Sequence, residues 1–165
     1  MEKQEYKEVA AMAANGDSKA FTRLYETIYR EMYYTAFYSL ADDADAVEVL
    51  IDTVRDAFAC IGKLHTESAF RLYMMKQLCA GIKNKFKEYA AEGREIFCDE
   101  NKYRPNRDGI DIKQEFNRLP DTERLVCSLY VGGKFLCDEI SQFTGLSAST
   151  VKKKLDRALM TFSLD

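Results

Sequence analysis

Side chains that can hydrogen-bond to DNA gather within the stretch 148–158, near the end of the chain. They are Ser149, Thr150, Lys152, Lys153, Asp156 and Arg157. Lysine and arginine donate to guanine or to phosphate, and an aspartate accepts from the amino group of cytosine. At about 100° per residue, a helix would place most of these residues opposite an apolar row. That row is Val151, Leu155, Ala158 and Phe162.

The residues before this stretch predict a second, shorter helix and a tight turn. The first helix opens at 138–140, and Gly145 can end it because glycine accepts the left-handed backbone of a helix C-terminus. Ser147 is a good N-cap for the helix that follows. The second helix is basic on its outer side, with Lys154 at the flank. Two helices joined by a glycine turn in this way indicate a helix-turn-helix. The alternative is an ordinary helical hairpin with a solvated lysine face.

The composition limits the classes of protein that fit. The chain has 165 residues and a net charge of −3, so any contact with DNA is local rather than a basic coat. Five cysteines and one histidine lack zinc-ligand spacing, and no nucleophile motif or glycine-rich phosphate loop is present. We therefore expect no enzyme, no metal and no cofactor. The chain lacks a long apolar run and an apolar leader, so we expect a cytoplasmic protein without membrane insertion.

The residue pattern of the N-terminal half predicts helices throughout. Residues 1–14 predict a short helix with Val9, Met12 and Ala13 inward, and Asp17 can cap a long helix over 18–40. Four tyrosines flank that helix, where they either stack on nucleic acid or pack within the protein: Tyr29, Tyr33, Tyr34 and Tyr38.

A third helix is expected over 45–61, with apolar residues that include Val47, Leu50 and Phe58 facing inward, together with Ile51 or Val54. Its outer side is acidic, with Glu48, Asp52 and Asp56. Such a side is either solvated or docks on a basic partner.

A fourth helix should run from a Thr66 cap to about residue 90, after a loop over 62–65. Lys76, Lys83 and Lys87 form a basic stripe on it, which serves either solubility or contact with a phosphate backbone.

Periodicity fails over 92–109, which predicts a linker. Residues 110–165 would form a second helical domain, in which Asp121 caps the helix that Gly132 and Gly133 end. The fold class expected is all-α, with domains over 1–91 and 110–165.

These residues resemble a bacterial RNA polymerase sigma factor of the extracytoplasmic-function (ECF) type. The stretch 119–159 is similar to region four of that family, and the stretch 21–58 more loosely resembles region two. The positions that carry the likeness are Leu119-Pro120, Glu123-Arg124, Glu139-Ile140, Gly145-Leu146-Ser147, Thr150-Val151, Arg157-Ala158, Phe21-x-x-Leu24-Tyr25, Asp52-Thr53 and Ala57-Phe58.

The resemblance implies partners and sites. Asp45, Glu48 and Asp52 would dock on the largest subunit of core RNA polymerase, and region four would sit on the second-largest subunit. The helix near 150 would read the upstream promoter element. The basic stripe, with Lys63 and His65 in the loop before it, would meet the downstream element. An anti-sigma factor is a further partner that the resemblance suggests.

The chain departs from the family pattern in the fourth helix. It has no tryptophan, and Ala80 and Asn84 stand where the family usually has an asparagine and an aspartate, as Ile51 stands for a glutamine in the third helix. Gly81 also lies inside the fourth helix, where glycine costs about 1 kcal/mol against alanine. Two alternatives to a sigma factor therefore remain open. One is a stand-alone helix-turn-helix regulator, and the other is a sigma-like interaction protein that has lost promoter melting.

Overall fold

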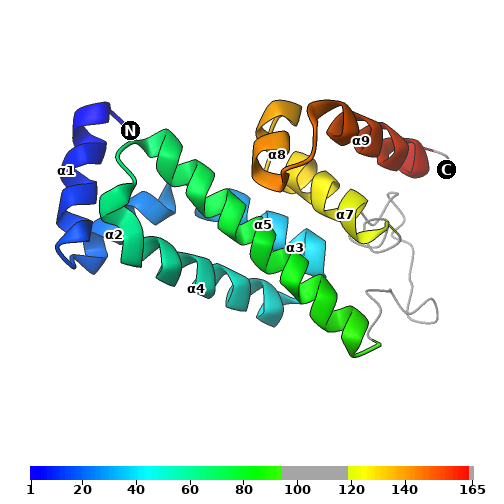
Figure 1. Cartoon of the computed structure of the whole chain (residues 1–165), viewed down its shortest axis with the longest axis horizontal. Coiled ribbons are helices and arrows are strands. Elements are labelled where there is room, and N and C mark those ends of the chain that lie inside the picture. Colours follow the sequence, from blue (N-terminus) through cyan, green and yellow to red (C-terminus); the bar gives the residue numbers. More distant parts are fainter. Residues whose placement is uncertain (94–118, 164–165) are drawn as a thin grey trace, which may run out of the picture.

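The computed structural model describes residues 1–93 and 119–163, with side chains as far as residue 160. All the secondary structure in these residues is helical, which confirms the expected all-α class (Figure 1). In chain order the elements are α1 (Lys3–Ala14), α2 (Ser18–Glu26), α3 (Tyr29–Leu40), α4 (Asp43–Cys60), the 3-10 turn η1 (Ile61–Lys63), α5 (Glu67–Ala91), α7 (Asp121–Cys127), the π-helical segment η3 (Ser128–Gly132), α8 (Cys137–Thr144) and α9 (Ala148–Ser163).

Helix α5 is the axis of the molecule. It packs against α3 and α4 on one side and against α8 on another. Residues at helical spacing along it, such as Phe70, Met74 and Leu78, are fully buried. Figure 1 shows α5 crossing the molecule, with α4 beside it and α8 and α9 beyond it. Among the described residues, no helix is both long and apolar enough to span a membrane.

Three of the expected N-caps are confirmed. The side chain of Asp17 accepts from two amides of α2, that of Thr66 accepts from Ala69 N, and Ser147 Oγ accepts from Thr150 N at 3.2 Å. The cap expected at Asp121 is wrong, because Pro120 holds the cap position and Asp121 is the first residue of α7. Its carboxylate instead accepts from Arg124 Nη2 at 2.5 Å.

The single helix expected over 18–40 is two helices. The chain breaks at Thr27 and Ile28, where Thr27 Oγ1 donates to Leu24 O at 2.6 Å and Ile28 leaves helical geometry. Arg71 of α5 approaches the freed carbonyl of Thr27 at 3.4 Å. Ile28 and Met32 remain fully buried across the break. The apolar spacing therefore continues through a bend that only tertiary contacts reveal.

The inward side of α4 differs from the one expected. The helix begins at Asp43, and its buried row is Ala46, Val49, Leu50, Thr53 and Ala57. Val47 is 38% exposed and Ile51 is 50% exposed, so Val47 was wrongly assigned to the core, and Val54 fits the inner row better than Ile51. The same kind of error affects Met12 on α1, which is 48% exposed.

Helices α4 and α5 approach each other closely at Gly81 of α5. A Cβ added to Gly81 of α5 would lie 2.8 Å from Val49 Cγ1. Glycine in mid-helix gives up about 1 kcal/mol of helix propensity, and here it permits α4 and α5 to touch.

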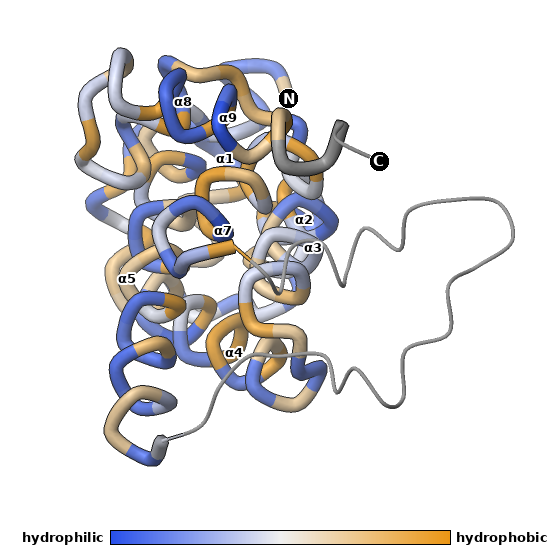
Figure 2. The backbone as a smooth tube through the Cα atoms, turned by 90° about the vertical axis from the view of Figure 1, so that its right-hand side faces the viewer, coloured by the Kyte–Doolittle hydropathy of each residue, from blue (hydrophilic) through white to orange (hydrophobic). Residues whose placement is uncertain are grey.

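The C-terminal helices (α7, η3, α8 and α9) pack directly on the N-terminal helices (α1–α5). Helix α7 and segment η3 lie on α3, and α8 lies on α5. Along α4 and α5, hydrophilic and hydrophobic residues alternate, as expected of helices that keep one side in water (Figure 2). Most of the expected linker, from residue 94 to 109, lies outside the described residues.

Arg124 of α7 joins the two sets of helices and is only 3% exposed. Its Nε donates to Ser39 O of α3 at 2.8 Å, and its Nη1 donates to Leu119 O at 2.8 Å. The guanidinium also lies 4.9 Å from the ring centroid of Phe86 on α5. Burial lowers the pKa of this guanidinium, while the nearby Asp121 carboxylate opposes that change.

Candidate nucleic-acid and partner interfaces

Helices α8 and α9 are joined by a turn of three residues. Gly145 adopts a left-handed φ of 80°, and its amide donates to Ser141 O at 2.9 Å. Ser141 Oγ donates to Leu146 O at 2.6 Å, which fixes the turn from the other side. These bonds hold the start of α9 in a defined orientation to α8.

Helix α9 keeps one side buried and one side in solvent. Val151, Leu155 and Ala158 are buried, as the apolar spacing predicts; the side chain of Phe162 lies outside the described ones. On the opposite side, five of the six expected DNA-contacting residues are exposed: Ser149, Lys152, Lys153, Asp156 and Arg157. The outward side of α9 thus offers cationic, hydroxyl and carboxylate groups to a ligand.

Two neighbouring residues of α9 are engaged within the protein. Thr150 is half-buried and its Oγ1 lies 2.8 Å from Ser147 Oγ, so part of its hydrogen-bonding capacity serves the helix start. Lys154 Nζ lies 3.2 Å from Glu123 Oε1 of α7, which is itself nearly buried. The flank position expected for Lys154 is consistent with this inward ion pair.

All three lysines of the basic stripe on α5 are exposed. One of them, Lys83, also donates from its Nζ to Thr144 O of α8 at 3.0 Å. Thr144 is the last residue of α8, where carbonyl groups lack helical partners and carry partial negative charge. No local pattern in the chain predicts this contact, because it joins residues 61 positions apart.

The loop residues expected near the downstream element lie beside a small groove. Lys63 and His65 are exposed, and His65 helps to line a cavity of about 190 Å³ between α1 and η1. Tyr6 of α1 closes its inner end by donating from its hydroxyl to Leu64 O at 2.7 Å. Burial raises the pKa of Tyr6 to about 12, so the hydroxyl keeps its proton at neutral pH.

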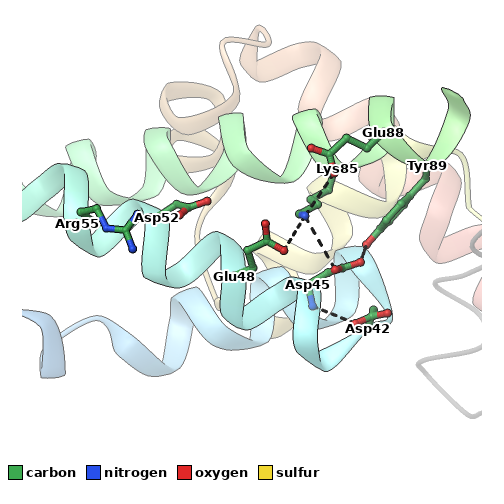
Figure 3. Close-up of polar contacts among 8 residues, drawn as sticks. All are labelled: Asp42, Asp45, Glu48, Asp52, Arg55, Lys85, Glu88 and Tyr89. Atoms are coloured by element: carbon green, nitrogen blue, oxygen red, sulfur yellow. Dashed lines mark hydrogen bonds and ion pairs between the residues drawn. The ribbon is translucent and has the colours of Figure 1, made fainter. Parts of the chain in front are cut away.

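Two of the three acidic residues expected to bind polymerase are engaged by α5 (Figure 3). Lys85 Nζ lies 2.9 Å from Glu48 Oε2 and 4.0 Å from Asp45 Oδ1, and the hydroxyl of Tyr89 donates to Asp45. The hydrogen bond that Lys85 donates to Glu48 raises the pKa of Lys85. Asp45 and Glu48 thus tie α4 to α5, although Glu48 also faces solvent.

The third acidic residue, Asp52, is exposed and pairs only loosely with Arg55, at 3.7 Å (Figure 3). Next to it the outer side of α4 is apolar. A groove of about 440 Å³ runs between α2 and α4, with Tyr29, Val47 and Ile51 on its exposed walls. The apolar spacing of the chain assigned Val47 to the core and therefore did not predict this groove.

The tyrosines of α3 stack mainly on one another. Tyr29 and Tyr33 have ring centroids 6.1 Å apart, and Tyr33 and Phe37 lie 5.8 Å apart with nearly parallel rings. Tyr33 also donates to Asp43 Oδ1 at 2.6 Å, and this bond raises its pKa to about 12. The row thus joins α3 to the start of α4, which favours the packing interpretation over a stacking surface for nucleic acid.

Comparison with known proteins identifies the fold. No family model matches the sequence, and no curated protein matches it. Among solved structures, the chain is similar to CnrH, an ECF sigma factor, in a structure of CnrH in complex with the cytosolic domain of CnrY. The TM-score is 0.68 at 18% identity, over 96% of this chain and 95% of that chain. The chain therefore has the all-helical fold of an ECF sigma factor over nearly its whole length.

Proposed function

We propose that this protein is a divergent ECF-type sigma factor, which binds core RNA polymerase and directs it to promoters. In this proposal residues 1–91 engage polymerase and the downstream promoter element, and residues 110–165 read the upstream element. Residues 92–109 form the linker between these two domains. The protein acts in the cytoplasm by binding, without chemistry of its own.

The observation that carries the proposal is the two-sided character of α9. Its apolar row is buried against the other C-terminal helices, and Lys152, Lys153 and Arg157 project from the opposite side. A helix presented in this way after a tight turn suits the major groove, where basic side chains reach guanine and phosphate. The likeness of the fold to CnrH supports the same interpretation.

Helix α4 is the part we propose for polymerase. Asp52 and the exposed edge of Glu48 supply negative charge, and Val47 and Ile51 supply apolar area beside them. A partner helix with a basic flank and an apolar stripe would complement both features. Because CnrH was solved with the cytosolic domain of CnrY, we also propose a protein partner of the anti-sigma class for this chain.

Reconstitution tests this proposal directly. The purified chain is added to bacterial core polymerase, and promoter-dependent transcripts are compared with those from core alone. A sigma factor binds core and yields specific transcripts. Absence of core binding would refute the proposal. Tight binding of the chain alone to a two-fold DNA site would instead indicate a stand-alone regulator.

One observation favours a second candidate, a sigma-like protein that binds polymerase without opening DNA. Lys83, in the middle of the helix expected to meet the downstream element, is exposed but already donates to Thr144 O of α8. Core binding without transcripts, on linear and on pre-melted templates alike, would support this candidate.

A further inference from the structure

The groove between α2 and α4 has the size and the lining of a small-molecule site. Its volume of about 440 Å³ lies within the range of ~300–1,000 Å³ that such sites occupy. The rings of Phe21 and Phe58 form an aromatic floor, in which they meet edge to face with centroids 5.1 Å apart. Val47, Ile51 and Tyr29 on the walls are between 38% and 50% exposed. The groove therefore keeps apolar area in contact with water.

The bend between α2 and α3 brings a second aromatic pair to this groove. Tyr25 of α2 and Tyr29 of α3 both line it, and their ring centroids lie 5.4 Å apart. Ile28, at the bend between them, is fully buried. The aromatic lining thus comes from three helices that the core holds in place, so the groove is formed before any ligand arrives.

Arg55 is the residue that carries a charge among the described residues that line the groove. Its side chain is 75% exposed, and its Nη1 lies 3.7 Å from Asp52 Oδ1, which is too long for a hydrogen bond (Figure 3). Within the part of the chain that the structure describes, the guanidinium donates no hydrogen bond. An exposed ion pair at this distance holds the guanidinium only weakly. Its donors are therefore available to a ligand.

The polar groups of the lining favour an anionic ligand. A guanidinium can bind one carboxylate through two parallel hydrogen bonds. The lining hydroxyl of Thr22 is used within α2, because its Oγ1 donates to Ser18 O at 2.9 Å. A ligand that matches the groove thus has an apolar body and a single carboxylate, whereas an ammonium group would meet the like charge of Arg55.

We propose that the groove between α2 and α4 binds an amphipathic carboxylate of the fatty-acid class. Its acyl chain lies along the aromatic floor, and its carboxylate accepts from the guanidinium of Arg55. This site rests only on the groove and on Arg55. The bound acid covers Val47 and Ile51, so it excludes a polymerase helix from α4, and this consequence rests on the proposed function.

The first experiment measures binding of cis-parinaric acid, a fatty acid whose fluorescence rises in an apolar site, to the full chain. Dodecanoate below its micellar concentration should displace the probe. At neutral pH dodecanol and dodecylamine should bind at least about tenfold more weakly than dodecanoate, because they lack the charge-assisted bonds to Arg55. Arg55→Met should lower the affinity for dodecanoate about tenfold and leave the affinity for dodecanol unchanged.

Two further variants locate the site on the surface. Ile51→Glu places a charge on the apolar wall and should weaken binding of dodecanoate and dodecanol alike. Leu136→Ser is the matched control, at an apolar residue of the C-terminal helices that is 68% exposed, and should change neither affinity. Because Arg55, Ile51 and Leu136 are all exposed, the three variants should keep the helix content of the unchanged chain by circular dichroism.

Three results would overturn the site. Cis-parinaric acid could fail to bind saturably. The three head groups could bind equally well, which would indicate general adsorption to apolar surface. Leu136→Ser could weaken binding as much as Ile51→Glu does, which would place the ligand elsewhere.

The second experiment tests whether the acid competes with polymerase. Binding of the full chain to immobilised core polymerase is measured with and without dodecanoate. Dodecanoate should reduce binding of the unchanged chain, and Arg55→Met should require about tenfold more of the acid for the same reduction. Binding of the acid without this competition would keep the site and refute its effect on polymerase.

The remaining outcomes separate this site from the proposed function. No binding to core polymerase, even without the acid, would refute the proposed function and leave the carboxylate site standing on the probe measurements. Loss of core binding by Ile51→Glu, in a chain that binds no fatty acid, would refute the site and assign the groove to a segment of the polymerase.

Discussion

Helix α5 carries four lysines and helix α9 carries three, yet the structure places their side chains differently. On α9, Lys152 and Lys153 stand in solvent and only Lys154 turns inward to an acidic partner. On α5, Lys83 is exposed but donates to Thr144 O of α8, and Lys85 is half-buried beside Glu48 of α4. Similar local composition therefore yields two lysines in solvent on one helix and two lysines bonded to neighbouring helices on the other, because tertiary packing decides which side chains meet a partner.

Arg124→Ala should most strongly weaken the contact between the C-terminal helices and the N-terminal helices. The substitution removes the donors to Ser39 O and Leu119 O and leaves a void over Phe86. Loss of hydrogen bonds from a buried charged group predicts a fall of about 3 kcal/mol in the free energy of unfolding. Urea denaturation followed by circular dichroism measures it.

Arg55→Ala is the matched control for that variant. Arg55 is exposed and meets Asp52 at 3.7 Å, so its removal should change stability by less than about 0.5 kcal/mol. Equal losses for the two arginines would mean that Arg124 does not hold the helices together.

The outward side of α9 is tested by Lys153→Glu combined with Arg157→Glu. Loss of two basic contacts should weaken upstream promoter binding by the holoenzyme by about 2 kcal/mol, or about thirtyfold. Electrophoretic mobility shift measures this loss. Both residues are exposed, so the free energy of unfolding should stay nearly constant. Unchanged promoter binding would show that this side of α9 does not read DNA.

The buried thiol of Cys79 on α5 leads us to expect a dependence of stability on pH. Burial raises the pKa of Cys79 from 9.0 to about 12, so the folded chain keeps a proton that the unfolded chain releases. Stability from this thiol is complete below pH 9 and declines as the pH rises toward 12, by about 1 kcal/mol per pH unit. Urea denaturation at pH 8, 9 and 10 should show a shallower decline for Cys79→Ala than for the unchanged chain. Parallel curves would argue against a desolvated thiol.

Gly81→Ala probes α5 on the side that faces α4 rather than the C-terminal helices. Overpacking against Val49 Cγ1 should outweigh the gain in helix propensity and lower stability by about 1 kcal/mol. In a double-mutant cycle with Val49→Ala, the double variant should lose less stability than the sum of the losses of the two single variants. Additive losses would contradict the close approach.

Local sequence signals were sufficient to predict that the elements are helices and where several of them begin. Hydrophobic spacing predicted the helical class, and side-chain oxygens at Asp17, Thr66 and Ser147 predicted where α2, α5 and α9 begin. The left-handed turn at Gly145 and the outward residues of α9 followed from the same rules. Capping and periodicity act within a few residues, so the chain alone determines them.

Contacts between distant segments decided the rest. The break at Ile28, the exposure of Val47 and Ile51, and the engagement of Asp45 by Tyr89 depend on which helices meet. So do the bonds from Arg124 to Ser39 O and from Lys83 to Thr144 O, across 85 and 61 positions. The sequence by itself determined that α5 and α9 are helices with basic sides. Only the tertiary structure decided which of those lysines also bond to a neighbouring helix, because such contacts depend on the neighbour and not on the helix itself.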